Sequence, residues 1–288
     1  MHSHRNKSII HTLALTIFVF FASVTTAPAA HSAAPQQVSS LEDLWIDMRI
    51  GSPLVPLFNE AFQPGDIARI DQASQIGQLA DIEDGRKLVI FRSVEETEQF
   101  LPDIADEIDI IGYNLEHNPD DPGNEPEDPV AAIQQMRAMA DDYGLELAFG
   151  PDHSYALSDG VEMAPYADIF VLQIQRVQTD PVTVKEFVET LVPELREANP
   201  DLEISVQVRT EGSVDDIIAL LDDLKGYLDG VSILTSPDTV DIAWELTAAL
   251  RPNVGNPSPG IDQTWVYIPV VIGLAGGTYL IYRHYRSR

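Results

Sequence analysis

The segment Ile108-Asp-Ile-Ile-Gly-Tyr-Asn-Leu-Glu-His-Asn118 is the most informative part of the sequence, because it is apolar at first and becomes polar toward its C-terminal end. Alternate side chains of a strand point to opposite faces, so Asn114 and Glu116 share one face while Tyr113 and Leu115 share the other. In a parallel sheet helices cover both faces, so both faces are usually apolar, and a polar face needs an explanation. A site at the mouth of an α/β barrel provides one.

On both sides of this segment, stretches with strand character alternate with helical stretches. The strand candidates are residues 88–92, 108–116, 145–150, 169–175, 204–209 and 231–235. The clearest helical stretches, with apolar residues at helical spacing, are residues 129–143, 182–198, 213–228 and 239–250. Alternation with short connections predicts a parallel sheet with right-handed crossovers.

The number of units predicts a (β/α)8 barrel of the TIM type. Six units are complete, and the segment 41–85 has room for two more strands, at residues 44–49 and near residues 76–82. Residues 40–250 would then form one domain, within the size range of such a barrel. An open doubly wound sheet is the alternative, but the chain has no G-x-G-x-x-G or P-loop motif to support it.

Polar residues recur on one face of the following strands. The residues that would share the inner face are Ala148, Gly150, Asp152, Gln173, Gln175, Ser205, Gln207 and Arg209. Their apolar neighbours would pack on the helices. Polar side chains that enter from four consecutive strands indicate a ligand cavity. The alternative is an internal network in which every polar group is already hydrogen-bonded.

Two histidines, His117 and His153, belong to the predicted domain. Each follows an acid at the end of a strand, Glu116 and Asp152 respectively, which places all four residues near one site. Adjacent residues on a strand point in opposite directions, so at most half of each pair can face the cavity, and we predict no metal. No lysine lies at the C-terminal end of a strand, which disfavours Schiff-base chemistry. We predict no cofactor.

Three consecutive strands carry a resemblance to a known family. The segment Gly112-Tyr-Asn-Leu-Glu116 looks like part of the D-G-x-D-x-D-x-E strand of glycoside hydrolase family 18, the chitinase family. The segment Leu147-Ala-Phe-Gly-Pro-Asp152 is similar to the next strand, and residues 167–175 resemble the following strand of plant-type members. The resemblance implies a TIM barrel in which the motif strand is the fourth, with a sugar-sized cleft.

The match departs from the family at the acids. Ile111 and Asn114 occupy the first and second aspartate positions, Glu116 the third, and Asn118 stands where the proton-donating glutamate should be. Asparagine cannot donate that proton, so hydrolysis by Glu116 would need another acid, and Asp152 is the nearest candidate. The predicted substrate-binding residues are Asn114, His117, Asn118, His153, Gln173, Gln175, Gln207 and Arg209.

Two functions stay open on this pattern. One is a glycoside hydrolase that uses Glu116 with Asp152. The other is a non-catalytic glycan-binding or surface-architecture protein that kept the barrel and lost the acid. The predicted partner in both is a glycan or cell-envelope polysaccharide.

The first 30 residues have the pattern of a signal peptide. Arg5 and Lys7 precede an apolar run at residues 9–24, and Ala27-Pro-Ala29 is a small-residue cleavage site. A buried core helix of similar length is the alternative. Export predicts that the mature chain begins near residue 30.

The C-terminal end carries a second apolar run, residues 265–282, which as a helix would span about 27 Å and cross a membrane once. Residues 251–264, rich in proline and glycine, would form a stalk. Arginines in the tail at residues 283–288 predict a cytoplasmic tail and an extracellular domain at the cell membrane. A sorting signal that is cut and replaced by another anchor is the alternative.

Composition narrows the partners further. Asp and Glu number 46 against 17 Lys and Arg, a formal net charge of −29, which excludes nucleic acid as a natural partner. There is no cysteine, so the exported domain has no disulfide and depends on its core for stability.

Overall fold

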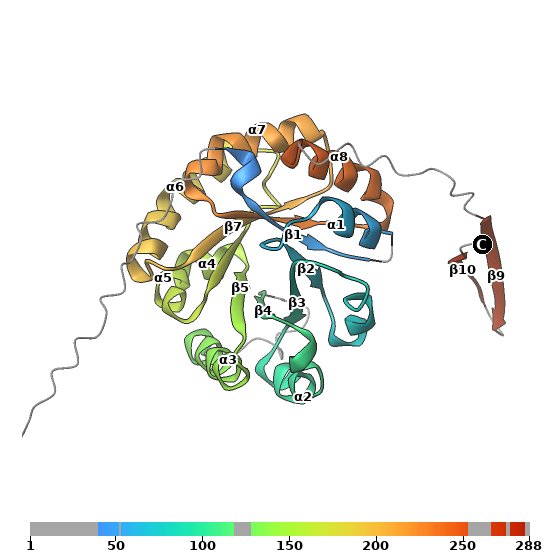
Figure 1. The fold of residues 1–288 in the computed structure, drawn as a ribbon, viewed down its shortest axis with the longest axis horizontal. Coiled ribbons are helices and arrows are strands. Elements are labelled where there is room, and N and C mark those ends of the chain that lie inside the picture. Colours follow the sequence, from blue (N-terminus) through green and yellow to red (C-terminus); the bar gives the residue numbers. More distant parts are fainter. Residues whose placement is uncertain (1–39, 52, 118–127, 253–265, 275–276, 286–288) are drawn as a thin grey trace, which may run out of the picture. The chain divides into compact units, whose positions relative to one another are not determined.

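The computed structural model describes residues 40–51, 53–117, 128–252, 266–274 and 277–285. Within these residues, eight parallel strands pair in chain order and the last lies beside the first, which closes a barrel (Figure 1). The strands are β1 (Trp45–Arg49), β2 (Ile67–Ile70), β3 (Arg86–Phe91), β4 (Ile110–Leu115), β5 (Glu146–Pro151), β6 (Ile169–Gln173), β7 (Glu203–Arg209) and β8 (Gly230–Leu234). The (β/α)8 architecture is confirmed, and the motif strand is the fourth.

The α-helices surround the barrel (Figure 1). They are α1 (Val55–Ala61), α2 (Val94–Ile104), α3 (Pro129–Tyr143), α4 (His153–Ser158), α5 (Gly160–Met163), α6 (Pro181–Ala198), α7 (Val214–Leu224) and α8 (Val240–Leu250). Short 3-10 helices cover Leu41–Asp43, Ala73–Gln78, Ala105–Glu107, Ala164–Tyr166, Lys225–Tyr227 and Pro237–Thr239. The segment between β2 and β3 thus has a 3-10 helix in place of an α-helix.

Local sequence fixes where the long helices begin and end. Asp128 and Asp180 cap α3 and α6 by accepting backbone hydrogen bonds, and each is followed by a proline, which suits the first helical turn. Gly144 ends α3 with a φ of 69°, a conformation that glycine adopts without strain. These signals lie in the sequence itself, and the predicted helix at residues 129–143 is confirmed.

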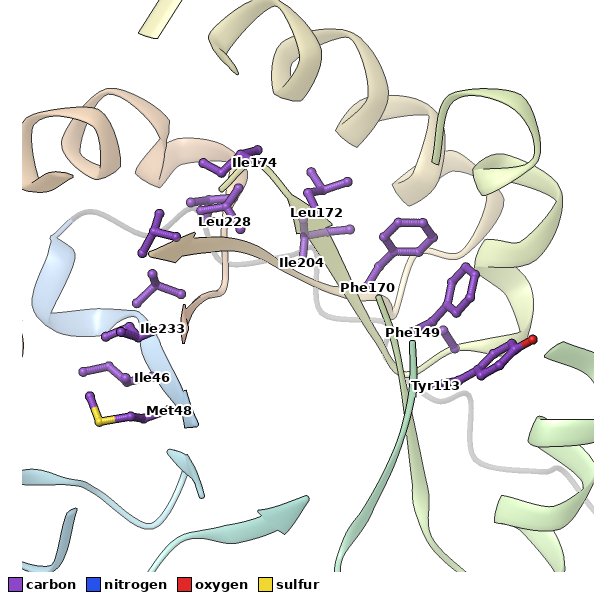
Figure 2. Packing of buried hydrophobic residues seen from close by; sticks show 14 of the residues in the cluster. Ile46, Met48, Tyr113, Phe149, Phe170, Leu172, Ile174, Ile204, Leu228 and Ile233 are labelled. Carbon is purple, nitrogen blue, oxygen red and sulfur yellow. The ribbon is translucent and has the colours of Figure 1, made fainter. Parts of the chain in front are cut away.

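The outer face of the strands is apolar and packs against the helices. Tyr113, Phe149 and Phe170, from the neighbouring strands β4, β5 and β6, are fully buried. Their rings form a row in Figure 2, with centroids 5.7 Å apart for the first pair and 5.3 Å for the second. Alternation in the sequence predicted that these side chains face away from the cavity. Phe149 and Phe170 are absent from the cavity lining, whereas Tyr113 is part of it.

The interior of the barrel is filled by a separate apolar cluster, which consists of Ile67, Leu88, Ile110, Ala148 and Ile169. Two glycines within strands make room for Ile90 and Trp45, which pack against this cluster. A Cβ atom at Gly112 would lie 2.5 Å from Ile90 Cδ1, and a Cβ atom at Gly230 would lie 2.1 Å from Trp45 Cδ2. Glycine is therefore required at both positions if the large side chains are to fill the barrel.

The N-terminal end of the barrel is closed by a charged and aromatic group. Arg86 binds Glu146 at 2.8 Å and Glu203 at 3.6 Å. Its guanidinium also lies 5.8 Å from the ring centroid of Trp45. These residues come from β1, β3, β5 and β7, so the group ties alternate strands together beneath the apolar interior.

A buried ion pair joins the end of the barrel to its beginning. Arg251, which follows α8, lies 2.8 Å from Asp66 and also donates to the carbonyl of Leu44 at 2.8 Å. Asp66 in turn accepts a hydrogen bond from the backbone of Ile46 at 2.7 Å. Burial raises the pKa of Asp66, although Arg251 opposes that shift. The pair holds the chain after the last helix against β1 and β2.

The predicted strand near residues 76–82 is wrong. The second strand is β2, Ile67–Ile70, and residues Ala73–Gln78 form a 3-10 helix. β2 has only four residues, and Arg69 interrupts its apolar pattern, so its period-two signal is short. The apolar residues at 76, 79 and 82 are spaced three apart, which is the spacing of a helical turn and not of a strand.

The C-terminal apolar run differs from its prediction. Where a helix was expected at residues 265–282, β9 (Val266–Leu274) and β10 (Gly277–Tyr285) pair as an antiparallel two-stranded sheet. Pro269 cannot donate a helical hydrogen bond, and the many valines and isoleucines nearby favour extended backbone. Across the described parts of the chain, no helix combines the length and apolar character needed to cross a membrane.

Other predicted segments fall outside the described residues. They are the signal peptide at residues 1–30, most of the stalk at residues 251–264, and the last three residues of the tail at 283–288.

Candidate functional site

A cavity of about 530 Å³ lies at the C-terminal end of the barrel, a size typical of small-ligand sites. Its charged and polar lining residues are Asp47, Arg49, Arg69, Asp71, Arg92, Asn114, Glu116, Gln173, Gln175, Arg176, Gln207, Arg209 and Ser232. Nearly every one lies in the last part of a strand or just after it. The carboxyl ends of barrel strands are where such folds hold their sites.

One wall of the cavity is a chain of amides that ends on a carboxylate. Gln175 donates to Gln173 at 2.9 Å, Gln173 donates to Asn114 at 2.9 Å, and Asn114 donates to Glu116 at 3.2 Å. Gln173 also donates to the carbonyl of Gly150 at 2.9 Å. These side chains therefore lie together on one wall of the cavity.

This amide chain leaves one acceptor open. Gln175 Oε1 is buried and meets no hydrogen-bond donor among the described residues. A buried acceptor without a donor costs free energy, so the site favours a hydroxyl or a water that can donate to it.

The floor of the cavity is a buried ion pair. Arg69 donates to Asp47 at 2.9 Å, and the Ser232 hydroxyl donates to the second carboxylate oxygen at 2.7 Å. Burial raises the pKa of Asp47, and the neighbouring Arg69 opposes that shift. Both side chains are almost fully enclosed, so the pair is fixed in place.

A second ion-paired acid stands above this floor. Asp71 lies 2.8 Å from Arg49 and 3.8 Å from Arg69. Two of the three carboxylates that line the cavity are therefore paired with arginine. The third, Glu116, is exposed and receives the Asn114 amide.

The remaining predicted residues of the lining are Gln207 and Arg209, both on the inner face of β7. The backbone N–H and carbonyl of Arg209 both bond the Gln178 amide, at 2.8 and 3.2 Å, which fixes the end of the strand. Its guanidinium has only a 4.0 Å contact with Glu211. Their position in the cavity agrees with the alternation in the sequence.

Asp152 has a structural role in place of the expected catalytic one. It caps α4, accepting from the Ser154 and Tyr155 backbones at 2.9 and 3.0 Å, and it accepts from the His117 backbone at 2.8 Å. Burial opposes its ionisation, yet these hydrogen bonds outweigh burial and hold the pKa of the carboxyl below its usual value. It is not among the cavity lining residues, and an ionised cap is a poor proton donor.

The two histidines also lie away from the cavity lining. The ring of His153 packs against Phe187 of α6, with centroids 4.2 Å apart. The ring of His117 meets the edge of Tyr155 at 6.5 Å. Asn118 lies outside the described residues.

Sequence reasoning missed most of the charged lining residues. Asp47 and Arg49 lie on the inner face of a strand that was predicted, so the same alternation would have found them. Arg69 was missed because β2 itself was not predicted. Arg92 and Arg176 directly follow apolar strand segments. A charged residue at the C-terminal end of a barrel strand is a candidate site residue, whether it is an arginine or an acid such as Glu116.

No metal-binding group emerges from the described part of the chain, where no three His, Asp, Glu or Cys side chains gather in a suitable cluster. The polar groups that do gather can donate hydrogen bonds through guanidinium and amide N–H groups, and can accept through Glu116 and Gln175. The arrangement is suited to holding a small polar ligand that has both hydroxyls and negative charge.

Comparison by sequence identifies no relative, since no protein-family model and no curated protein matches the chain. The fold and cavity define the class: an α/β barrel with a polar cavity at the C-terminal ends of its strands.

Comparison by structure finds other proteins of diverse kinds. One match is the carboxyl transferase domain of Rhizobium etli pyruvate carboxylase, with 12% identity and a TM-score of 0.47 over 75% of this chain and 44% of that one. Another is HMG-CoA lyase from Bacillus subtilis, with 10% identity and a TM-score of 0.49 over 77% and 92%. A third is a Pyrococcus furiosus chitinase domain, with 9% identity and a TM-score of 0.49 over 67% and 83%.

These likenesses are too distant to carry an argument about function. This chain spans less than half of the first of the three. The assignment of the fold depends on the strand pairing described above, which closes the barrel without reference to any relative.

Proposed function

We propose that this protein binds a carbohydrate at the mouth of its barrel and does not hydrolyse it. The observation that carries the proposal is the amide chain from Gln175 through Gln173 and Asn114 to Glu116. Amide and carboxylate groups in a fixed row are suited to hydroxyl groups, which both donate and accept. The resemblance of β4 to the chitinase motif strand supports a sugar as the source of those hydroxyls.

The state of the acids favours binding over hydrolysis. Glycoside hydrolysis uses two carboxyl groups, one of them protonated, on either side of the scissile bond. Asp47 and Asp71 are ion-paired with arginine, and Asp152 is an ionised helix cap. Glu116 is thus left without a second acid that is free of an arginine partner among the described residues of the cavity lining.

A hydrolase that uses Glu116 is the second candidate function. Its support is the position of Glu116 at the end of β4, held by Asn114, where the resemblance implies an acid beside the reacting sugar. The two candidates differ in what one substitution would do.

The substitution is Glu116→Gln, tested on an N-acetylated oligosaccharide by calorimetry and by assay of released sugar. If the protein only binds, the parent shows no turnover and the variant changes the binding free energy by about 1 to 3 kcal/mol. If it hydrolyses, the variant lowers turnover by roughly 100-fold or more. Glu98→Gln, which removes an exposed charge on α2, is the matched control. Unchanged binding and activity in folded Glu116→Gln would contradict both.

We further propose that the barrel acts outside the cell and is held at the membrane by its C-terminal apolar run. The signal-like N-terminus supports export, and the apolar character of residues 265–282 supports attachment to the membrane.

A further inference from the structure

The nine arginines between residues 40 and 252 fall into two groups. Five line the cavity, and four lie outside it. Each of those four binds a carboxylate at 2.6 to 2.8 Å; they are Arg86, Arg137, Arg196 and Arg251. In a chain with a large excess of acids, arginine outside the cavity finds a carboxylate partner.

Three of the five cavity arginines depart from this rule. Arg69 and Arg49 are paired with acids at the floor. Arg92 and Arg176 make no side-chain ion pair or hydrogen bond with any described residue, and Arg209 has only its 4.0 Å contact. The cavity therefore holds guanidinium groups whose donors are not taken up by the described residues, in a protein whose net charge is −29.

These three arginines come from separate elements. Arg92 follows β3, Arg176 lies shortly after β6, and Arg209 ends β7, yet all three line one cavity. With five arginines and three carboxylates, the lining has a formal surplus of two positive charges. A cavity whose lining carries a net positive charge, inside an acidic surface, favours a ligand of negative charge.

We infer that the ligand is an anionic carbohydrate, whose carboxylate or phosphate oxygens bind Arg92, Arg176 and Arg209. This inference rests on the proposed function for its carbohydrate part. Guanidinium groups bind such oxyanions with paired, charge-assisted hydrogen bonds. The buried acceptor of Gln175, beside these arginines, accepts a hydroxyl from the same ligand.

The test measures binding of matched probes to the full chain in a nonionic detergent by calorimetry. The probes are a galacturonic acid trimer, the neutral galactose trimer, galactose 6-phosphate and inorganic phosphate. We expect an anionic sugar to bind at least about 10-fold more tightly than the neutral trimer. Loss of one charge-assisted hydrogen bond lowers the affinity by about 10-fold. Raising the salt concentration should weaken that binding, because the cavity is open to solvent.

Variants identify the residues responsible. Arg92→Ala, Arg176→Ala and Arg209→Ala should each weaken binding of the anionic sugar by about 10-fold and weaken binding of the neutral trimer by a smaller factor. Arg176→Lys keeps the positive charge but lacks the paired N–H donors of a guanidinium group. It should therefore bind the anionic sugar more tightly than Arg176→Ala and less tightly than the parent. Lys185→Ala, on the outer helix α6, removes the same charge far from the lining and should change nothing. Thermal melts confirm that each variant is folded.

The outcomes separate the inference from the proposed function. Tighter binding of the galacturonic acid trimer or of galactose 6-phosphate than of the neutral galactose trimer supports the inference. The tighter of the two shows whether the site takes a carboxylate or a phosphate. Equal affinity for acidic and neutral trimers overturns the inference and leaves carbohydrate binding intact. Arginine-dependent binding of inorganic phosphate without any sugar supports the anion site and overturns carbohydrate binding. Failure of every probe overturns both.

Discussion

At the scale of the residue, Asp152 illustrates how a carboxylate at the end of a strand can serve the fold. Replacing it with Ala removes a helix cap and the bond to the His117 backbone, so stability should fall by about 1 to 2 kcal/mol. Asp152→Asn keeps one acceptor oxygen and should cost less. Denaturant unfolding at neutral pH measures both.

The same residue predicts a dependence on pH. The pKa of Asp152 is lower in the folded state, so its contribution is present above the unfolded value of 3.8 and is lost as pH falls through the folded value. The stability gap between the parent and Asp152→Asn should therefore close in acid. A variant that instead kept its stability but lost sugar hydrolysis would return Asp152 to a catalytic role.

Tyr113 makes the opposite prediction in alkali. Burial raises its pKa to about 12 from 10.0, so its contribution to stability is complete below pH 10 and is lost as pH rises through about 12. Between pH 9 and 11 the parent should lose about 1 kcal/mol more stability than Tyr113→Phe. Tyr143→Phe, at an exposed position on α3, is the control and should follow the parent. Parallel curves for the parent and Tyr113→Phe would contradict the raised pKa.

At the scale of the element, Gly112 of β4 sets how closely β3 approaches. Gly112→Ala would bring a Cβ within 2.5 Å of Ile90 Cδ1 and 2.8 Å of Leu88 Cδ2, and overpacking of this kind costs about 1 to 3 kcal/mol. Ile90→Val removes the nearer of those atoms. The double variant should therefore be more stable than the sum of the two single changes predicts.

The control for this experiment is Gly77→Ala, because a Cβ there has no neighbour within 4 Å. Its stability should match the parent. Additive losses in the double variant would mean that the contact between β3 and β4 is not what requires glycine.

Elements also explain what could be predicted from the sequence. Asn114, Gln173 and Gln207 were placed in the cavity because they lie within strands, where the alternation of side chains is strict. Asp152 and His153 were misjudged because the strand ends at Pro151 and a helix begins at once. Beyond that point the period of two no longer determines where a side chain points.

The charge of the cavity could not be predicted in the same way. Arg69 belongs to a strand of four residues that was not recognised, and its partner Asp47 is 22 positions away. Ser232, which completes that network, is 185 positions from Asp47. Only closure of the barrel brings β8 beside β1, so no short stretch of the sequence predicts this network.

At the scale of the whole molecule, the ion pair of Arg251 with Asp66 defines where the domain ends. A chain of residues 40–252 should fold, whereas one of residues 40–250 loses the arginine and leaves a buried carboxylate unpaired. Breaking such a pair costs about 3 to 5 kcal/mol. Arg251→Ala in the longer chain should match the shorter one in a denaturant series. Equal stability of all three proteins would exclude this role for the pair.

The proposed orientation of the molecule has a direct test. Protease added to intact cells should remove the barrel, because the signal-like N-terminus predicts that the domain is exported. Cells opened by detergent provide the comparison. A barrel that is degraded only after the cells are opened would refute export.

The closed N-terminal end of the barrel constrains any polymer that the protein meets. Trp45, Arg86 and their carboxylate partners lie beneath the apolar interior, so the cavity is a pit and not a tunnel. A long chain cannot thread through it. Such a polymer can offer only a terminus or a side branch to the pit, and whatever enters has to leave by the way it came.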